Sequence, residues 1–136
     1  MSFEVSTDPS RIDIALVHEF LSSSYWAKGR PREVVQRSIE HSLCFGVYEN
    51  GKQIAFARLV TDRAVFAYLA DVFVVPEHRG RGVARVLLDA IFEHPEVKGL
   101  RLIRLGTRDA HGLYAKYGFA PISTERSMEL FLDALE

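Results

Sequence analysis

A short segment in the second half of the chain alternates glycines with arginines: Arg79-Gly80-Arg81-Gly82-Val83-Ala84. An apolar stretch ending at Pro76 precedes this segment, and the apolar spacing after it predicts an amphipathic helix. The first turn of a helix leaves backbone N–H groups unpaired, and the helix dipole favours negative charge there. Glycines let phosphate oxygens approach the backbone, and arginines add positive charge. The segment is therefore predicted to hold a phosphate or pyrophosphate group.

Two familiar nucleotide-binding loops do not fit this segment. The dinucleotide fingerprint places a third glycine where Arg85 stands, and a Walker A loop needs a Gly-Lys-Ser/Thr sequence that is absent. What remains is an Arg-x-x-Gly-x-Ala pattern at a helix N-terminus. Because short glycine patterns are common, the alternative is an ordinary strand-to-helix turn with exposed arginines.

The other chemically reactive residues predict no competing site. Cys44 is the single cysteine and lies in an apolar run, so it is interpreted as a core residue and the chain forms no internal disulfide. The five histidines, at positions 18, 41, 78, 94 and 111, have no metal-ligand spacing, so no metal site is predicted.

The elements that position the loop follow from apolar periodicity and turn residues. Helices are predicted from Asp8-Pro9, from Pro31, from Val83 to His94 and from Asp109 to Tyr117. Strands are predicted at 3–5, 43–48, 53–60, 65–75, 100–105, 119–122 and 127–132.

Two glycine-containing turns separate these elements. Asn50-Gly51 indicates a hairpin, and Gly118 indicates a left-handed helix end. The long apolar strand at 65–75 is expected to be covered on both faces. The order β-α-α-β-β-β-α-β-α-β-β predicts one α/β domain over residues 1–136, with a mixed central sheet flanked by helices and no doubly wound topology.

Composition limits the classes of partner. Lys plus Arg number 17 and Asp plus Glu 18, so the net charge of -1 gives no field that would favour nucleic acid or an anionic membrane. No apolar run is long enough to span a bilayer, and the N-terminal residues do not resemble a signal peptide. With a single cysteine, these features lead us to expect a cytoplasmic protein.

The residues from Asp71 to Ala84 match the central motif of a known family, a strand followed by Arg/Gln-x-x-Gly-x-Gly/Ala and a helix. A second family signature, Leu-Tyr followed by Gly-Phe, is present as Leu113-Tyr114 and Gly118-Phe119. On these two motifs, and on the element order of the whole chain, the sequence resembles the GNAT superfamily of N-acetyltransferases.

This resemblance implies an enzyme that transfers an acetyl group from acetyl-CoA directly to a primary amine of a small molecule or peptide, with no metal. It implies that Tyr114 protonates the departing thiolate and that the backbone N–H of Val74 stabilises the oxyanion. Thr107 stands where the family often has an asparagine near the pantetheine. The implied acetyl-CoA contacts are Val72, Phe73, Val74, Arg79, Gly80, Arg81, Gly82, Val83, Ala84, Thr107 and Tyr114. Relatives are frequently homodimers.

The general base is left open. Tyr68 stands where some relatives carry a glutamate, so the candidates are His111, which precedes Tyr114 on the same short helix, and Asp71. Strand alternation puts Asp71 on the face opposite Val72 and Val74, where its carboxyl group could instead be satisfied by backbone. A water chain is a third solution.

The family's acceptor site lies near the segment between the first two helices, which implies a substrate role for Tyr25 and Trp26. A role in the core under a loop is an equal alternative for this aromatic pair. Arg58 and Asp62 are also candidate substrate residues, and they are expected to pair with each other. Two alternative functions are a non-catalytic acyl-CoA-binding or sensing module, and an interaction or nucleic-acid-binding module, which the neutral charge disfavours.

Overall fold

The computed structural model describes residues 2–132 and falls into two units, one ending at Leu105 and one beginning at Gly106. The first unit is built on a five-stranded sheet in the order β1-β2-β3-β4-β5. The pairs from β1 to β4 are antiparallel, and β4 pairs with β5 in parallel, so the predicted mixed sheet is confirmed. The strands are β1 Glu4–Ser6, β2 Leu43–Glu49, β3 Lys52–Thr61, β4 Phe66–Val74 and β5 Leu102–Leu105.

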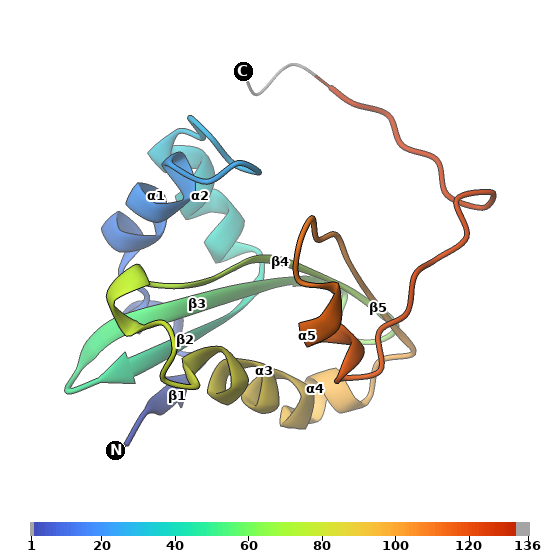
Figure 1. The fold of residues 1–136 in the computed structure, drawn as a ribbon. Helices are drawn as coiled ribbons and strands as arrows, with labels where there is room; N and C mark the ends of the chain where they lie inside the picture. The colour runs from blue at the N-terminus through green and yellow to red at the C-terminus, as the bar shows by residue number, and fades with distance from the viewer. Residues whose placement is uncertain (1, 133–136) are drawn as a thin grey trace. The chain divides into compact units, whose positions relative to one another are not determined.

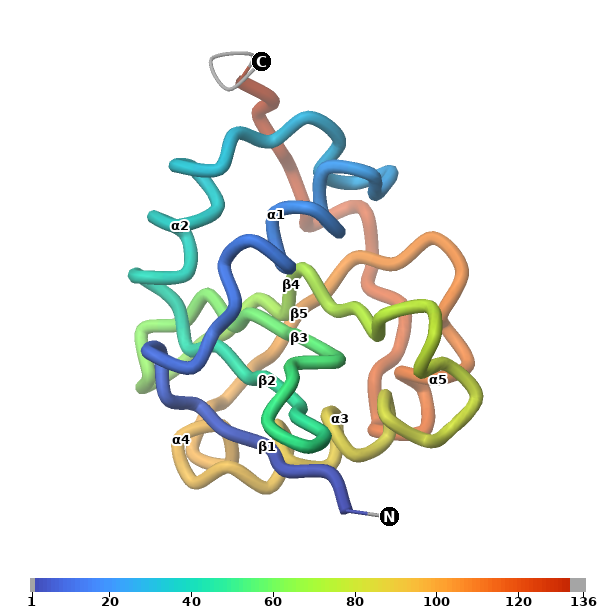
Figure 2. Tube along the Cα trace, turned by 90° about the vertical axis from the view of Figure 1, so that its left-hand side faces the viewer, coloured from blue at the N-terminus to red at the C-terminus, as the bar shows by residue number. Residues whose placement is uncertain are grey.

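Helices cover both faces of this sheet. Figures 1 and 2 show α1 and α2 on one face and α3 and α4 on the other. Two single-turn 3₁₀ helices, η1 and η2, precede α1 and α3. The bounds are η1 Pro9–Arg11, α1 Ile14–Ser22, α2 Arg32–Glu40, η2 Pro76–His78, α3 Val83–Glu93 and α4 Pro95–Lys98.

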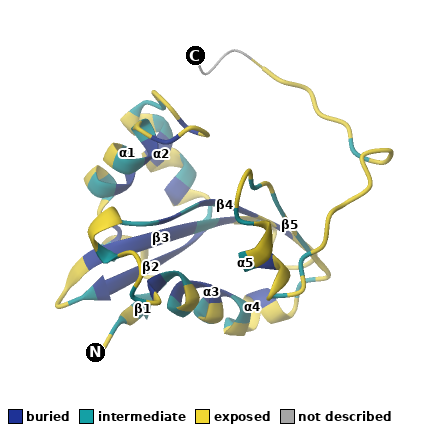
Figure 3. Ribbon diagram, in the orientation of Figure 1, coloured by how far each residue is buried: buried dark blue, intermediate teal, exposed yellow. Residues whose placement is uncertain are grey.

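Apolar side chains fill the space on each side of the sheet, and Figure 3 shows the buried strands between half-exposed helices. The core on the α1–α2 face includes Val17, Leu21, Val35, Phe56 and Phe73. On the other face, α3 packs against β2 and β3. Its buried residues are Val83, Leu87, Leu88 and Ile91.

The start of the first helix differs from the prediction. Asp8 caps only the short η1, and the α1 helix begins five residues later than Pro9, at Ile14. The side chain of Asp13 accepts the N–H of Leu16 at 3.1 Å, so a second N-cap fixes this later start. The predicted hairpin at Asn50-Gly51 is confirmed, because both residues have positive φ, 52° and 79°.

The expected cover on both faces of β4 is wrong for its first half. Phe66 and Tyr68 are 38% and 42% exposed, whereas Ala67 and Leu69 between them are buried. Along the first half of β4, buried and exposed side chains therefore alternate, and only one face of the strand belongs to the core.

The second unit contains one short helix, α5, at His111–Ala115. The sequence predicted that Asp109 would cap this helix, and that prediction is wrong, because no side chain caps it. The Thr107 hydroxyl accepts the N–H of Ala110, the residue before the helix, at 3.0 Å. Gly118 has φ 98°, as its predicted left-handed position requires.

The two strands predicted at the end of the chain are wrong, because residues 119–132 form no strand. Met128 and Leu130 are 98% and 83% exposed. The apolar pattern of a strand is present there, but a strand forms only where a neighbouring strand pairs with its backbone.

Candidate functional site

The loop between β4 and α3 has a backbone shaped for an anion. Gly80 and Gly82 have φ values of 77° and 81°, a left-handed conformation that other residues adopt at a cost. A Cβ added at either glycine would meet no atom within 4 Å. The glycines are therefore required by the backbone conformation, and the space beside them is open to a ligand.

The first turn of α3 supplies the hydrogen-bond donors. Its first intrahelical bond runs from the N–H of Val86 to the carbonyl of Gly82, at 3.1 Å, and no side chain caps the helix. The N–H groups of Val83, Ala84 and Arg85 precede that bond, so the helix itself does not use them. Together with the open space at Gly80 and Gly82, these donors fit a pyrophosphate at the helix N-terminus.

Arg81 holds the loop in place. Its guanidinium makes two hydrogen bonds to the Glu49 carboxylate, at 3.0 and 2.6 Å, and a third to His78 Nδ1 at 2.7 Å. The hydrogen bond from Arg81 lowers the pKa of Glu49. The Arg81 side chain is therefore committed to the end of β2, and its backbone is the part that remains for a phosphate group.

The strand before the loop has an open edge. Pairing between β4 and β5 runs only from Phe66 to Leu69, so the same edge from Ala70 to Val74 has no strand partner among residues 2–132. The N–H of Val75 donates to Ile54 on β3 at 2.9 Å. Because successive residues of a strand point to opposite edges, Val74 directs its N–H and C=O to the open edge. Arg79 Nε donates to the Val74 carbonyl there, at 3.2 Å.

A β-bulge lies where this edge opens. Phe56 pairs with Phe73 and Arg58 with Ala70, so one residue of β3 faces both Asp71 and Val72. Asp71 has φ 57°, which is unusual for a residue inside a strand. A bulge bends its strand and increases the local twist, and this one coincides with the end of the β4–β5 pairing.

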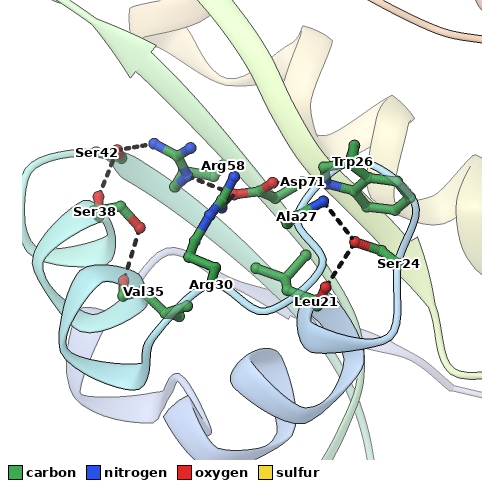
Figure 4. Close-up of polar contacts among 10 residues, drawn as sticks. All are labelled: Leu21, Ser24, Trp26, Ala27, Arg30, Val35, Ser38, Ser42, Arg58 and Asp71. Atoms are coloured by element: carbon green, nitrogen blue, oxygen red, sulfur yellow. Dashed lines mark hydrogen bonds and ion pairs between the residues drawn. The ribbon is translucent and has the colours of Figure 1, made fainter. Parts of the chain in front are cut away.

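The bulge carries the Asp71 side chain into a polar cluster beneath the loop that joins α1 and α2 (Figure 4). Its Oδ1 accepts the indole N–H of Trp26 at 2.9 Å. Its Oδ2 accepts Arg58 Nε at 2.9 Å and Arg30 Nη1 at 3.1 Å. Arg58 Nη1 also donates to the Ser42 hydroxyl at 3.2 Å. We call Trp26, Arg30, Arg58 and Asp71 the Asp71 cluster.

The remaining predicted site residues lie in the second unit. Tyr114 lies in α5 and contacts the Phe119 ring edge-on, with ring centroids 5.9 Å apart. His111 is the first residue of α5 and is exposed. Thr107 belongs to the turn that leads into the helix, where its hydroxyl is bonded to backbone.

Comparisons with known proteins agree with this arrangement. A family model described as an acetyltransferase (GNAT) domain matches residues 40–121. A crystal structure of an inferred GNAT-family acetyltransferase from Xanthomonas campestris pv. campestris has 52% sequence identity and a TM-score of 0.94, over 99% of this chain and 96% of that one. The chain belongs to the GNAT acetyltransferase family.

Two curated proteins extend the comparison of this GNAT acetyltransferase. An inferred acetyltransferase of Gibberella zeae is 31% identical over 135 residues, which is 82% of this chain and 75% of that protein. The chloroplastic serotonin N-acetyltransferase 2 of Oryza sativa subsp. japonica is 27% identical over 124 residues, 87% of this chain and 62% of that protein.

The expected pairing of Arg58 with Asp62 is wrong. Arg58 binds Asp71, and Asp62 accepts the N–H groups of Ala64, Val65 and Phe66 in the β3–β4 turn. These backbone hydrogen bonds lower the pKa of Asp62. Its carboxylate therefore stabilises the turn of the acetyltransferase through Oδ1, which accepts all three of these bonds.

Burial accounts for the inert role predicted for Cys44. Removal from water raises the pKa of its thiol to about 12. A thiol with such a pKa supplies almost no thiolate at neutral pH, so Cys44 is unsuited to act as a nucleophile. Among residues 2–132, no group of three or more His, Cys, Asp and Glu side chains could hold a metal ion, and no helix could cross a membrane.

Sequence reasoning missed the role of Arg30 and the bulge at Asp71. One signal was available: Asp71 is an acidic residue within an apolar strand, and a buried carboxylate requires partners. The spacing of the sequence did not indicate which partners, because Trp26, Arg30 and Arg58 come from a loop and from another strand.

Proposed function

We propose that this GNAT acetyltransferase transfers the acetyl group of acetyl-CoA to a primary amine of a small molecule or peptide by direct attack. The observation that carries the proposal is the open edge of β4 running into the uncapped N-terminus of α3. The thioester arm of acetyl-CoA can pair with the open edge of β4, and its pyrophosphate can accept hydrogen bonds from the N-terminus of α3. Both features lie within the first unit, in one continuous segment from Ala70 to Arg85.

The transfer balances without a covalent enzyme intermediate. The uncharged amine nitrogen attacks the thioester carbonyl, a C–N bond forms, the C–S bond breaks, and the nitrogen loses a proton while the CoA sulfur gains one. The N–H of Val74 would donate to the carbonyl oxygen as negative charge develops on it. The side chain of Tyr114 would give the proton to the sulfur, since a phenol near pKa ~10 and a thiol near ~8.5 are closely matched.

The loop residues divide between backbone and side-chain roles in this proposal. Gly80, Gly82, Val83 and Ala84 offer backbone to the pyrophosphate. Val72 and Phe73 lie with Val74 on the strand along which the pantetheine would run, and Thr107 would contact the same arm. Arg79 already lies at the Val74 carbonyl, so its charge would face the cofactor from that side.

Asp71 is poorly suited to the role of general base. A base must direct a free lone pair at the amine, and the two Asp71 oxygens already accept three hydrogen bonds from Trp26, Arg30 and Arg58. In this proposal Asp71 is a positioning residue, and the amine proton leaves through His111 or a water.

The amine acceptor is supported by the rice relative, whose name states that it acetylates serotonin, a primary amine. Cytoplasmic location and a homodimeric state remain predictions.

Thiol release from acetyl-CoA, measured with polyamines, amino acids, aminoglycosides and peptides, tests the proposal. We expect amine-dependent release of CoA with acetylated amine as the product. Binding of acetyl-CoA without turnover would favour the acyl-CoA-sensing alternative, and no binding of acetyl-CoA would contradict both functions.

The role of Tyr114 has a matched control within the same segment. Tyr114→Phe should lower kcat by about 10²-fold or more with little change in the affinity for acetyl-CoA, as removal of a general acid does. Tyr117→Phe, three residues later, should retain kcat. Equal kcat in wild type and Tyr114→Phe would remove the assignment.

A further inference from the structure

The Asp71 cluster carries an unbalanced positive charge. It contains two guanidinium groups, those of Arg30 and Arg58, and one carboxylate, that of Asp71. Among residues 2–132, no second carboxylate lies within 4.0 Å of either guanidinium. Charge removed from water is costly unless an opposite charge accompanies it, so the cluster has the composition of a site that is completed by an anion.

The excess charge is accessible at Arg30. The side chain of Asp71 is 2% exposed and that of Arg58 14%, whereas that of Arg30 is 24% exposed. Arg30 uses only Nη1 in its bond to Asp71, and its other donors have no partner among the described residues. A guanidinium held on one side by a carboxylate can present its remaining N–H groups to a second carboxylate.

Two exposed aromatic residues lie in the same loop as Arg30. Trp26 and Tyr25 are 40% and 52% exposed, and their rings meet edge to face with centroids 5.1 Å apart. Trp26 is fixed by its hydrogen bond to Asp71, so its ring is held in one orientation. The loop between α1 and α2 therefore offers exposed aromatic surface in the same segment as the Arg30 cation.

The cluster lies next to the edge proposed to hold the acetyl group. Asp71 immediately precedes Val72, and its positive φ is a strained conformation that persists only when the surroundings enforce it. Strain of this kind is typical of functional positions. The hydrogen bonds from Trp26, Arg30 and Arg58 supply that enforcement.

We propose that Arg30 and Arg58 form a binding site for a carboxylate on the acceptor, so that the amine substrate is an amino acid or a peptide presenting a free carboxylate. The proposal rests on the proposed function. One carboxylate would bring the charge of the cluster to zero, whereas a phosphate dianion would leave it negative beside the buried Asp71. The cluster therefore favours a monoanion over a phosphate ester.

A purely structural role is the competing account: the cluster would only fix the loop between α1 and α2 onto the sheet. The two accounts differ in one property. A structural clamp has no preference among ligands, whereas a carboxylate site distinguishes an acid from its amide.

Trp26 provides a direct measurement, because it is the single tryptophan of the chain and belongs to the cluster. Its fluorescence is titrated with N-acetylphenylalanine and N-acetylalanine, with their carboxamides, and with inorganic phosphate, at constant ionic strength and with and without CoA. We expect half-saturation by the acids at concentrations about tenfold or more below those for the amides and phosphate. Equal responses to acid and amide would overturn the proposal, as would a preference for phosphate.

Variants then assign the effect to Arg30. Arg30→Met should abolish the preference for the acid, and Arg30→Lys should retain part of it, because lysine keeps the charge and loses the planar fork. Arg37→Met, an exposed arginine on α2, is the matched control and should keep the full preference. An unchanged preference in a folded Arg30→Met would contradict the assignment, and the wild-type comparison of acid with amide stands even if a variant fails to fold.

The same ligands separate this proposal from the function on which it rests. Selective binding of acids without any acetyl transfer would overturn the proposed function and leave the carboxylate site standing. Acetyl transfer to amines with no advantage for those carrying a carboxylate would overturn the carboxylate site and leave the proposed function standing.

Discussion

The loop before α3 and the Asp71 cluster both contain arginines, but they offer hydrogen-bond donors to negatively charged groups in different ways. The loop offers backbone N–H groups from neighbouring residues, and its one well-anchored arginine, Arg81, is bound to Glu49. The cluster uses side chains from distant positions, 26, 30, 58 and 71, which gather around a buried carboxylate.

In the proposals made above, the loop binds the acetyl donor and the cluster binds the acceptor. A backbone site depends first on conformation, so the two glycines matter more there than the identity of most side chains. A side-chain site depends on identity, so single substitutions can change both its stability and its preference. The two regions should therefore respond differently to substitution, and the following experiments test that contrast.

The largest effect on stability is expected in the cluster. Asp71→Asn keeps the shape and the tolerance for positive φ but removes the charge that holds two partly buried guanidiniums, and it should lower the free energy of unfolding by about 3 kcal/mol. Urea unfolding measures this change. Asp89→Asn, in an exposed pair with Arg85, is the control and should cost ~1 kcal/mol or less. A similar cost for both variants would mean that the cluster is no tighter than a surface ion pair.

Backbone conformation should decide binding at the loop. Gly82→Ala forces a Cβ into a left-handed position and into the open space beside α3, and it should weaken acetyl-CoA binding about tenfold or more. Gly51→Ala is a closely matched control, since Gly51 has φ 79° and equally open surroundings in the β2–β3 hairpin. Calorimetry should show normal acetyl-CoA affinity for Gly51→Ala, and equal weakening in both variants would show that strain alone is responsible.

The ion pair that anchors the loop should give a pH-dependent and smaller effect. The hydrogen bond from Arg81 holds the pKa of Glu49 below its ordinary 4.5 in the folded protein. Its stabilisation is therefore complete above pH 4.5 and is lost as the pH falls through the lower folded value. The difference in Tm between wild type and Glu49→Gln should be constant from pH 7 to pH 5.5 and shrink at lower pH. A difference that does not change with pH would exclude this ion pair as its source.

The last prediction needs no substitution and concerns the reactivity of the Cys44 thiol, which is buried beside the cluster. With its pKa raised from 9.0 to about 12, the thiolate fraction at pH 8 falls on the order of 10³-fold, so Ellman's reagent should react with it far more slowly in the folded than in the unfolded chain. Rapid reaction of the folded protein would show that the core around Arg58 and Asp71 opens readily.

The same contrast explains what the sequence could predict. The loop, the hairpin at Asn50-Gly51 and the left-handed Gly118 were predictable, because each depends on neighbouring residues whose types dictate backbone conformation. The Asp71 cluster was not, because its members meet only after β3 and β4 pair with a bulge. Arg58 was assigned to Asp62 on sequence proximity, and the pairing of the strands brought it to Asp71 instead.

The end of the chain shows a second limit of pattern reasoning. Residues 119–122 and 127–132 have the composition of strands and form none in the structure. Alternation reports which face of a strand can be buried, whereas the existence of a strand depends on a partner that the pattern does not name.

The central claim is that the uncapped start of α3 holds the pyrophosphate of acetyl-CoA. Calorimetric titration with acetyl-CoA and with S-acetylpantetheine, which carries the same acetyl thioester without the nucleotide and pyrophosphate, tests it most directly in wild type and in Gly82→Ala. We predict that wild type binds acetyl-CoA at least tenfold more tightly than S-acetylpantetheine, and that Gly82→Ala loses most of that advantage. Equal binding of the two compounds by wild type, or an undiminished advantage in Gly82→Ala, would contradict the claim.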